Sequence, residues 1–178
     1  MEIVVYGDTD RRPVTYTLLK LFKTLGDVAL LSNDRHYKRL VDGAEAGELE
    51  SIFVSVGDYS PDDVFDSLEM DKDDFEYVIY DGIIPDTCDL FIHVAGCKMS
   101  EEEEDTLGCF DEVVTIPLGY GNKCVPYTIK MFQSIEEIEG YKQLKEVDPA
   151  LTKYLASILT QPLRLPVNTI RKVVARKR

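Results

Sequence analysis

Apolar and polar positions alternate along the chain with two different periods, and this alternation predicts most of the fold. Residues 2–6 are apolar and mostly β-branched, which is typical of a buried strand. From Val14 the apolar residues recur at helical spacing, and Gly26 ends the predicted helix. Residues 28–31 form a second apolar strand. A strand, a polar loop, a helix and a strand make a βαβ unit, which implies a parallel sheet with a right-handed crossover.

The alternation continues beyond this first unit. Further strands are predicted at residues 52–56, 75–81, 90–95 and 113–118. Ser60 and Pro61 favour the start of one helix, and Ser100 with Glu103 forms a capping box for another. The acidic residues 71–76 indicate a solvated loop, and residues 44–51 fit neither period.

The C-terminal third of the chain has a mainly helical pattern. Apolar residues from Val125 to Tyr141 predict one or two helical segments, and Pro149 opens a further helix that stops before Pro162. We therefore expect a doubly wound α/β fold, with a mainly parallel sheet, flanking helices and a helical C-terminal extension. The expected organisation is a core at residues 1–124, a helical extension packed on it at 125–162, and a tail at 163–178.

Charge separates the tail from the rest of the chain. The formal net charge is −13, but six basic residues and no acidic ones follow Pro162, which leaves −19 on residues 1–162 (−13 minus 6). These basic residues are Arg164, Arg171, Lys172, Arg176, Lys177 and Arg178. An acidic body argues against a nucleic-acid-binding face on the main domain. The tail could instead dock on nucleic acid, on a membrane, on an acidic partner or on the acidic body of a neighbouring copy.

The remaining bulk features favour a cytoplasmic protein without a cofactor. No apolar run approaches the ~20 residues that span a bilayer, and the N-terminus does not have the pattern of a signal peptide. The four cysteines include no C-x-x-C pair, and only two histidines could join them. Reduced, partly buried thiols are therefore expected in preference to a zinc site. The four are Cys88, Cys97, Cys109 and Cys124.

The loop at residues 7–13 is the first candidate site. Backbone N–H groups and the helix dipole favour an anion at such a helix N-terminus. A phosphate-binding loop has the pattern G-x-x-x-x-G-K-[ST]. This loop keeps Gly7 but has neither the second glycine nor the lysine; Pro13 stands near the lysine position, and Thr15 or Thr17 supplies the only nearby hydroxyl.

Asp81 is the second candidate. It ends the apolar strand 75–81 and precedes Gly82. Carboxylates at the carboxyl ends of parallel strands are where α/β folds place ligand or magnesium contacts. The alternative is a strand-end turn, because Asp-Gly is a common turn pair. His93 lies inside an apolar run, which favours a core histidine over a ligand or a base.

These segments together resemble a known family. Residues 4–7 with the following loop, 27–34, 75–81 and 88–94 are similar to successive strands of the MinD/ParA branch of P-loop nucleotide-binding proteins, in a degenerate form without a functional Walker A motif. The resemblance covers roughly residues 1–121. It implies that Asp81 corresponds to the Walker B aspartate, which acts through magnesium, and that any nucleotide would be bound by Gly7, Arg11, Arg12, Thr15 and Asp81. MinD-like proteins often carry a C-terminal amphipathic helix that binds membrane, and the tail here has the basic half of that design.

Three functions remain open from the sequence. The first is a non-catalytic interaction, positioning or assembly module, a pseudo-ATPase, with a protein partner or with itself. The second is an atypical magnesium-dependent ATPase or GTPase, in which Arg11 and Arg12 replace the lysine and Asp81 organises the metal. The third is an unrelated α/β protein such as a receiver-like regulator. Membrane or nucleic acid would be bound only through the basic tail.

Overall fold

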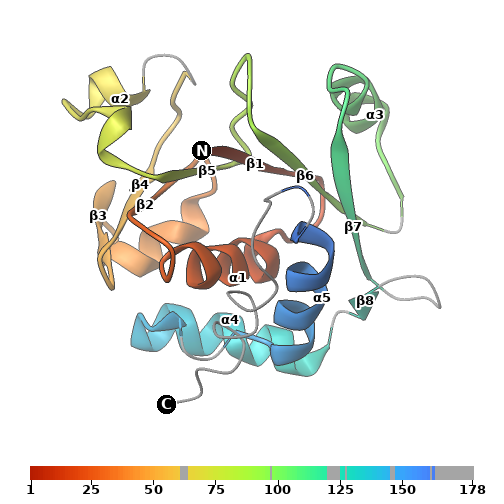
Figure 1. The fold of residues 1–178 in the computed structure, drawn as a ribbon. Helices are drawn as coiled ribbons and strands as arrows, with labels where there is room; N and C mark the ends of the chain where they lie inside the picture. Colours follow the sequence, from red (N-terminus) through yellow and green to blue (C-terminus); the bar gives the residue numbers. More distant parts are fainter. Residues whose placement is uncertain are drawn as a thin grey trace.

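The computed structural model of the chain describes residues 1–60, 64–96, 98–119, 125–126, 128–144, 147–160 and 162. It is an α/β fold with one mostly parallel sheet and helices on both of its faces (Figure 1). The expected fold class is therefore confirmed. The basic tail lies outside the described residues, and so do Pro61, Cys97 and Cys124.

The sheet has the strand order β3-β4-β2-β5-β1-β6-β7-β8. Its strands are β1 (Glu2–Tyr6), β2 (Val28–Ser32), β3 (Ala46–Leu49), β4 (Ile52–Val56), β5 (Tyr77–Asp81), β6 (Leu90–Ala95), β7 (Val113–Gly119) and the two-residue β8 (Val125–Pro126). All described pairs are parallel except β3 with β4. The parallel pairing follows from the strand–helix alternation of the sequence, because each crossover needs an intervening segment.

Two layers of helices cover the sheet. The α-helices are α1 (Arg12–Phe22), α2 (Val64–Ser67), α3 (Glu101–Leu107), α4 (Ile129–Tyr141) and α5 (Pro149–Leu159), and the 3₁₀ helices are η1 (Arg35–Val41) and η2 (Lys72–Asp74). In Figure 1, α1, α4 and α5 lie on one face of the sheet, and α2 and α3 lie on the other. Among the described residues, no helix combines the length and the apolar character needed to cross a membrane.

Each face of the sheet has its own apolar core. The larger core joins β-strand side chains to α1, η1, α4 and α5 and includes Leu18, Leu40, Ile135 and Leu155, all nearly or fully buried. The smaller core lies under α2 and the segment after α3, around Tyr80 and Phe91. The helical extension is thus part of the main core and packs on α1.

Helix starts follow the predicted chemistry at several places. Ser100 caps α3 by accepting a hydrogen bond from the Glu103 amide, as the sequence indicates. The Glu103 side chain contacts the Asp8 amide and His93, so the second half of the expected capping box is not formed. Pro149 occupies the first turn of α5, and Asp148 caps that helix by accepting two backbone N–H groups.

The structure differs from the sequence-based expectation at two points. Val125 does not begin a helix: it lies in β8, and α4 begins at Ile129 after the capping Thr128. The segment that fitted neither period contains β3, an antiparallel edge strand joined to β4 through Glu50 and Ser51, which both have positive φ. The hairpin is hard to recognise because its turn has no glycine.

Candidate functional site

Strand register brings the loop after β1 and the carboxylate of Asp81 to one edge of the sheet. β5 lies between β1 and β2, and Asp81 pairs with Val5 on one side and with Ser32 on the other. The backbone N–H of Gly82 continues the ladder by donating to the Val5 carbonyl at 3.0 Å. Because β1 leads directly into residues 7–11, Asp81 faces that loop.

The Asp81 side chain is fully buried and its oxygens are occupied by donors of the chain itself. Arg11 Nε donates to Oδ1 at 2.8 Å. Thr15 Oγ1 and Tyr37 OH donate to Oδ2 at 2.5 and 2.7 Å. The Asp81 carbonyl also accepts a hydrogen bond from Ser32 Oγ at 3.0 Å. The carboxylate is therefore compensated from within the protein, as a buried charge must be.

Arg11 lies between the loop at residues 7–11 and the end of β5. Besides its ion pair with Asp81, its Nη1 donates to the Gly7 carbonyl at 2.6 Å. Burial alone would lower the pKa of Arg11, but the charge and the hydrogen bond of Asp81 outweigh burial, so the pKa is raised above its ordinary value. The guanidinium is thus fixed as a cation that spans the loop and β5.

The backbone N–H groups in the first turn of α1 are also accounted for. The Arg12 amide donates to Asp10 Oδ1 at 3.1 Å, and Pro13 has no amide hydrogen. The amides of Val14 and Thr15 donate to the Arg11 carbonyl at 2.9 and 3.0 Å. An anion at this helix start would need N–H groups that point to it, and these four positions supply none.

A second carboxylate reaches the same loop from α3. Glu103, which is 1% exposed, accepts from the Asp8 amide at 3.2 Å and lies 2.7 Å from His93 Nε2. Gly7 has φ +145°, and a Cβ there would lie 2.2 Å from the Val94 carbonyl oxygen. Glycine is needed here because the loop packs directly on the end of β6. His93 is a buried, hydrogen-bonded core histidine, as expected.

Arg12 points away from Asp81 and belongs to a separate network. It forms two contacts of 2.9 Å with Asp10 and one of 2.9 Å with Glu139 of α4. Glu139 also accepts from Arg39 Nη1 at 2.9 Å and from Tyr16 OH at 3.1 Å. This network joins α1, η1 and α4, so it holds the helical extension against the core.

Tyr16 and Tyr37 connect the two networks. Their rings meet edge to face with centroids 5.7 Å apart. Burial, followed by the charge of Glu139, raises the pKa of Tyr16, and burial, followed by the charge of Asp81, raises the pKa of Tyr37. Both phenols are therefore held as neutral donors to their carboxylates.

Of the five residues named as candidate nucleotide ligands, the structure brings together Gly7, Arg11, Thr15 and Asp81, but not Arg12. Thr17 also lies elsewhere, since its hydroxyl donates to the Pro13 carbonyl. The Asp81-Gly82 pair ends β5 in a turn in which Gly82 has φ +74°. The expected turn at Asp81-Gly82 is therefore present, and a ligand or magnesium contact of Asp81 stays a prediction.

Sequence reasoning did not find the residues that complete these networks. Tyr37, Glu103 and Glu139 supply partners from segments far along the chain. A buried polar residue within an apolar face, such as Glu139 between Ile135 and the end of α4, is the sequence signal that could have identified one of them.

Neither the arrangement of possible metal ligands nor comparison with known proteins assigns a function to this site. Within the part of the chain that the structure describes, no group of three or more histidine, cysteine, aspartate or glutamate side chains is arranged to hold a metal ion. Comparison with known proteins finds no family model that matches the chain and no similar curated protein. The six basic tail residues lie outside the described residues.

Proposed function

We propose that the chain is a non-catalytic, MinD/ParA-like interaction or assembly module, a pseudo-ATPase whose former nucleotide site has become a structural network. The observation that carries the proposal is the fully buried Asp81 carboxylate, whose two oxygens receive three hydrogen bonds from the chain's own side chains. A carboxylate that organises magnesium needs oxygen lone pairs open to the metal or to its water shell. Here Arg11, a permanent internal cation, pairs with Asp81 in place of a metal ion.

The loop supports the same proposal. A phosphate-binding loop uses glycines, a lysine and free backbone N–H groups to hold the phosphates. Here the lysine is missing, the Arg12 amide is taken by Asp10, and the Asp8 amide is taken by Glu103. A triphosphate would have to displace two carboxylates and would face their negative charge.

A role in interaction fits the surface of the helical extension. Ile129 and Phe132 on α4 are 79% and 49% exposed, respectively, and Tyr141 at its end is 76% exposed. Large exposed apolar side chains on one helix are a feature of protein contact surfaces. The proposal includes a protein partner or self-assembly, and a cytoplasmic location, with which the free thiols of Cys88 and Cys109 are consistent.

One observation favours the alternative of an atypical magnesium-dependent ATPase or GTPase. Gly7, Arg11, Thr15 and Asp81 lie together, so a nucleotide that displaced the guanidinium from Asp81 would meet a cation, a hydroxyl and a carboxylate at one place. In that case Arg11 would contact phosphate in place of the lysine.

Calorimetry with ATP and with GTP, each with magnesium, separates the two functions. We expect no binding heat from the wild-type chain at millimolar nucleotide, and no turnover in a sensitive phosphate-release assay. Tight binding that is lost in Arg11→Ala/Arg12→Ala, or turnover that is lost in Asp81→Ala, would overturn the pseudo-ATPase proposal. Arg35→Ala, which changes an exposed arginine of η1, is the control for loss of a positive charge outside the loop.

A further inference from the structure

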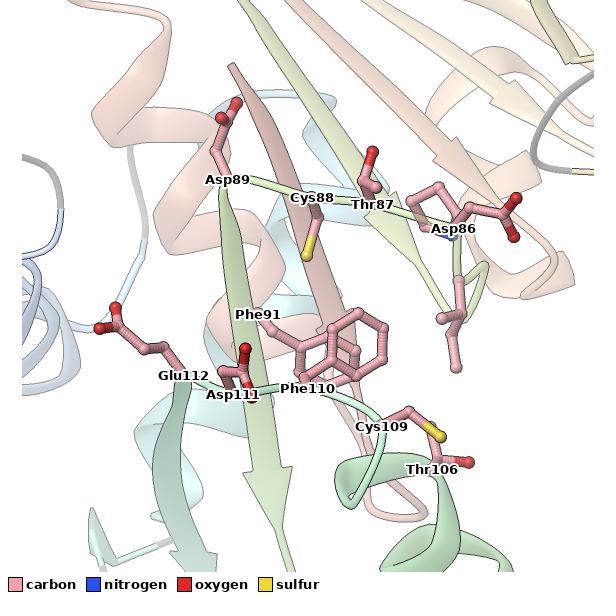
Figure 2. Close-up of a pocket in the computed structure, with 12 residues that line it drawn as sticks. Asp86, Thr87, Cys88, Asp89, Phe91, Thr106, Cys109, Phe110, Asp111 and Glu112 are labelled. Atoms are coloured by element: carbon pink, nitrogen blue, oxygen red, sulfur yellow. The ribbon is translucent and has the colours of Figure 1, made fainter.

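A surface pocket lies on the sheet face opposite to α5. Its volume is about 690 Å³, and it is formed by the segment between β5 and β6 and by the segment between α3 and β7 (Figure 2). Its apolar wall contains Ile84, Phe91 and Phe110, and the two phenylalanine rings pack with centroids 4.2 Å apart. Both rings belong to the smaller core of the molecule, so the wall is firmly supported.

The rim of this pocket is acidic. Asp86, Asp89, Asp111 and Glu112 line it and are exposed, and no lysine, arginine or histidine is among the lining residues. Asp89 also accepts a hydrogen bond from the Glu2 amide, so it is held in place by the body of the protein. The pocket therefore combines an apolar wall with four carboxylates, and its ligand should be an apolar segment that carries several positive charges.

The C-terminal tail of the chain has this composition. Within residues 167–178, the apolar Val167, Ile170, Val173 and Val174 alternate with basic side chains. These basic side chains are Arg171, Lys172, Arg176, Lys177 and Arg178. The tail carries no acidic residue and contrasts with the −19 of the remaining chain, so its attraction to an acidic, partly apolar pocket is favourable in both charge and hydrophobicity.

We propose that the pocket binds residues 167–178 of a second copy of this chain. α5 packs in the core on the α1 side of the sheet, whereas the pocket walls belong to the core on the other side (Figure 1). The tail follows α5, which lies on one face of the sheet, and the pocket lies on the other face. Binding of the tail to the pocket of the next copy is therefore a head-to-tail contact. Such contacts form a closed assembly, such as a dimer that exchanges tails reciprocally, when the geometry permits it, and otherwise generate open assemblies. This inference rests on the proposed function and names its partner as the chain itself.

The contact predicts a specific pattern of association among variants. In sedimentation velocity at low salt, the full chain should form concentration-dependent oligomers. A chain that ends at Pro166 should stay monomeric, and so should Asp111→Lys/Glu112→Lys, which reverses two exposed pocket charges. Glu136→Lys/Glu137→Lys on α4 changes the net charge equally outside the pocket and should associate like the wild type. Association should weaken at high salt, because exposed charges are screened.

Mixing the two defective chains gives the decisive result. The tail-less chain keeps the pocket and the Asp111→Lys/Glu112→Lys chain keeps the tail, so together they should form 1:1 dimers and nothing larger. Association of the tail-less chain alone, wild-type association of the pocket variant, or a full-length chain that remains monomeric would each overturn the proposal. Circular dichroism of each variant verifies that it is folded.

Cysteine reactivity locates the contact independently. Cys88 and Cys109 both line the pocket, and Cys109 is exposed (Figure 2). Iodoacetamide should modify Cys109 more slowly in the full chain than in the tail-less chain. The decrease in rate should be proportional to the fraction of associated chain that sedimentation measures. Equal rates in an associating sample would overturn the placement of the tail. Slower modification in a full-length chain that stays monomeric would show the tail in its own pocket and exclude the second copy.

These measurements separate this inference from the proposed function. Nucleotide calorimetry reports on the loop at residues 7–13 and on Asp81, which lie outside the pocket lining. Binding of ATP would overturn the pseudo-ATPase proposal while the mixing result still stood. Absence of both nucleotide binding and association would overturn only the contact described here.

Discussion

At the scale of single residues, the Asp81 carboxylate receives hydrogen bonds from three side chains of the candidate site. Its charge is buried, so each partner that is removed leaves an uncompensated cost rather than a lost surface contact. Arg11 is the partner with a full positive charge, whereas Thr15 and Tyr37 are neutral donors. The stability of this site therefore depends most on the arginine.

Arg11→Ala should destabilise the protein by about 3 kcal/mol, the lower range for breaking a buried ion pair, since the Arg11 side chain keeps 18% exposure. Urea unfolding followed by circular dichroism measures the change. Arg35→Ala should alter stability by less than about 0.5 kcal/mol, because Arg35 is exposed. Equal effects of the two substitutions would mean that the Arg11–Asp81 pair contributes nothing to the folded state.

The buried Tyr16 and Tyr37, whose phenols donate to buried carboxylates, make a prediction for alkaline pH. Their pKa values are raised in the folded state, so the unfolded state releases these protons first, at an ordinary pKa of about 10. Stability from these groups is fully present below about pH 10 and is lost as the pH rises further. Ultraviolet titration should show exposed tyrosines ionising first and Tyr16 and Tyr37 ionising only as the protein unfolds. In Tyr16→Phe the late phase should shrink by one phenol, and an unchanged late phase would contradict this assignment.

At the scale of elements, residue pattern and side-chain pairing differ in how far they can be predicted. The apolar strands and the capped helices follow from local periods and capping chemistry, and the structure bears out their order. The antiparallel β3 was not predicted, because its turn at Glu50 and Ser51 has no glycine signal. The contact of Arg12 with Glu139 was also missed, since the two residues are 127 positions apart and no local pattern relates them.

That contact predicts how α4 is held. Glu139→Gln keeps the shape of the side chain but removes the charge that Arg12 and Arg39 share, so we expect a loss of about 2 kcal/mol. Hydrogen exchange should show faster opening of α4, while β1 and β5 keep their protection. Glu137→Gln, on the exposed face of the same helix, should change neither stability nor exchange measurably. Slower exchange of α4 in Glu139→Gln would mean that the buried charge opposes packing.

At the scale of the whole molecule, the loop at residues 7–13 illustrates the limit of sequence-based reasoning about the site. The missing lysine and glycine set this loop apart from a phosphate-binding loop, but did not indicate which groups contact it. Glu103 on α3 accepts from the Asp8 amide and Arg11 pairs with Asp81, and these contacts became visible only when the register of β5 against β1 was known. Strand order is a long-range property, so the contacts of Glu103 and Arg11 could not be predicted from the segments in which these residues lie.

The charge of the whole molecule predicts its response to salt. With a net charge of −13, repulsion among exposed carboxylates opposes folding, whereas the buried Arg11–Asp81 pair is screened little by salt. Raising the sodium chloride concentration should therefore raise the thermal midpoint of a dilute sample. Relief of about 1 kcal/mol of repulsion corresponds to roughly 2–4 °C for a chain of this size.

The chain that ends at Pro166 sharpens this prediction. Removal of Arg171, Lys172, Arg176, Lys177 and Arg178 makes the net charge more negative by five, so its midpoint should rise more steeply with salt than that of the full chain. Differential scanning calorimetry of both chains across a salt series measures the two slopes. Midpoints that fall with salt in both chains would show that exposed ion pairs outweigh repulsion. Equal slopes would mean that the tail's charges lie too far from the acidic body to reduce its repulsion.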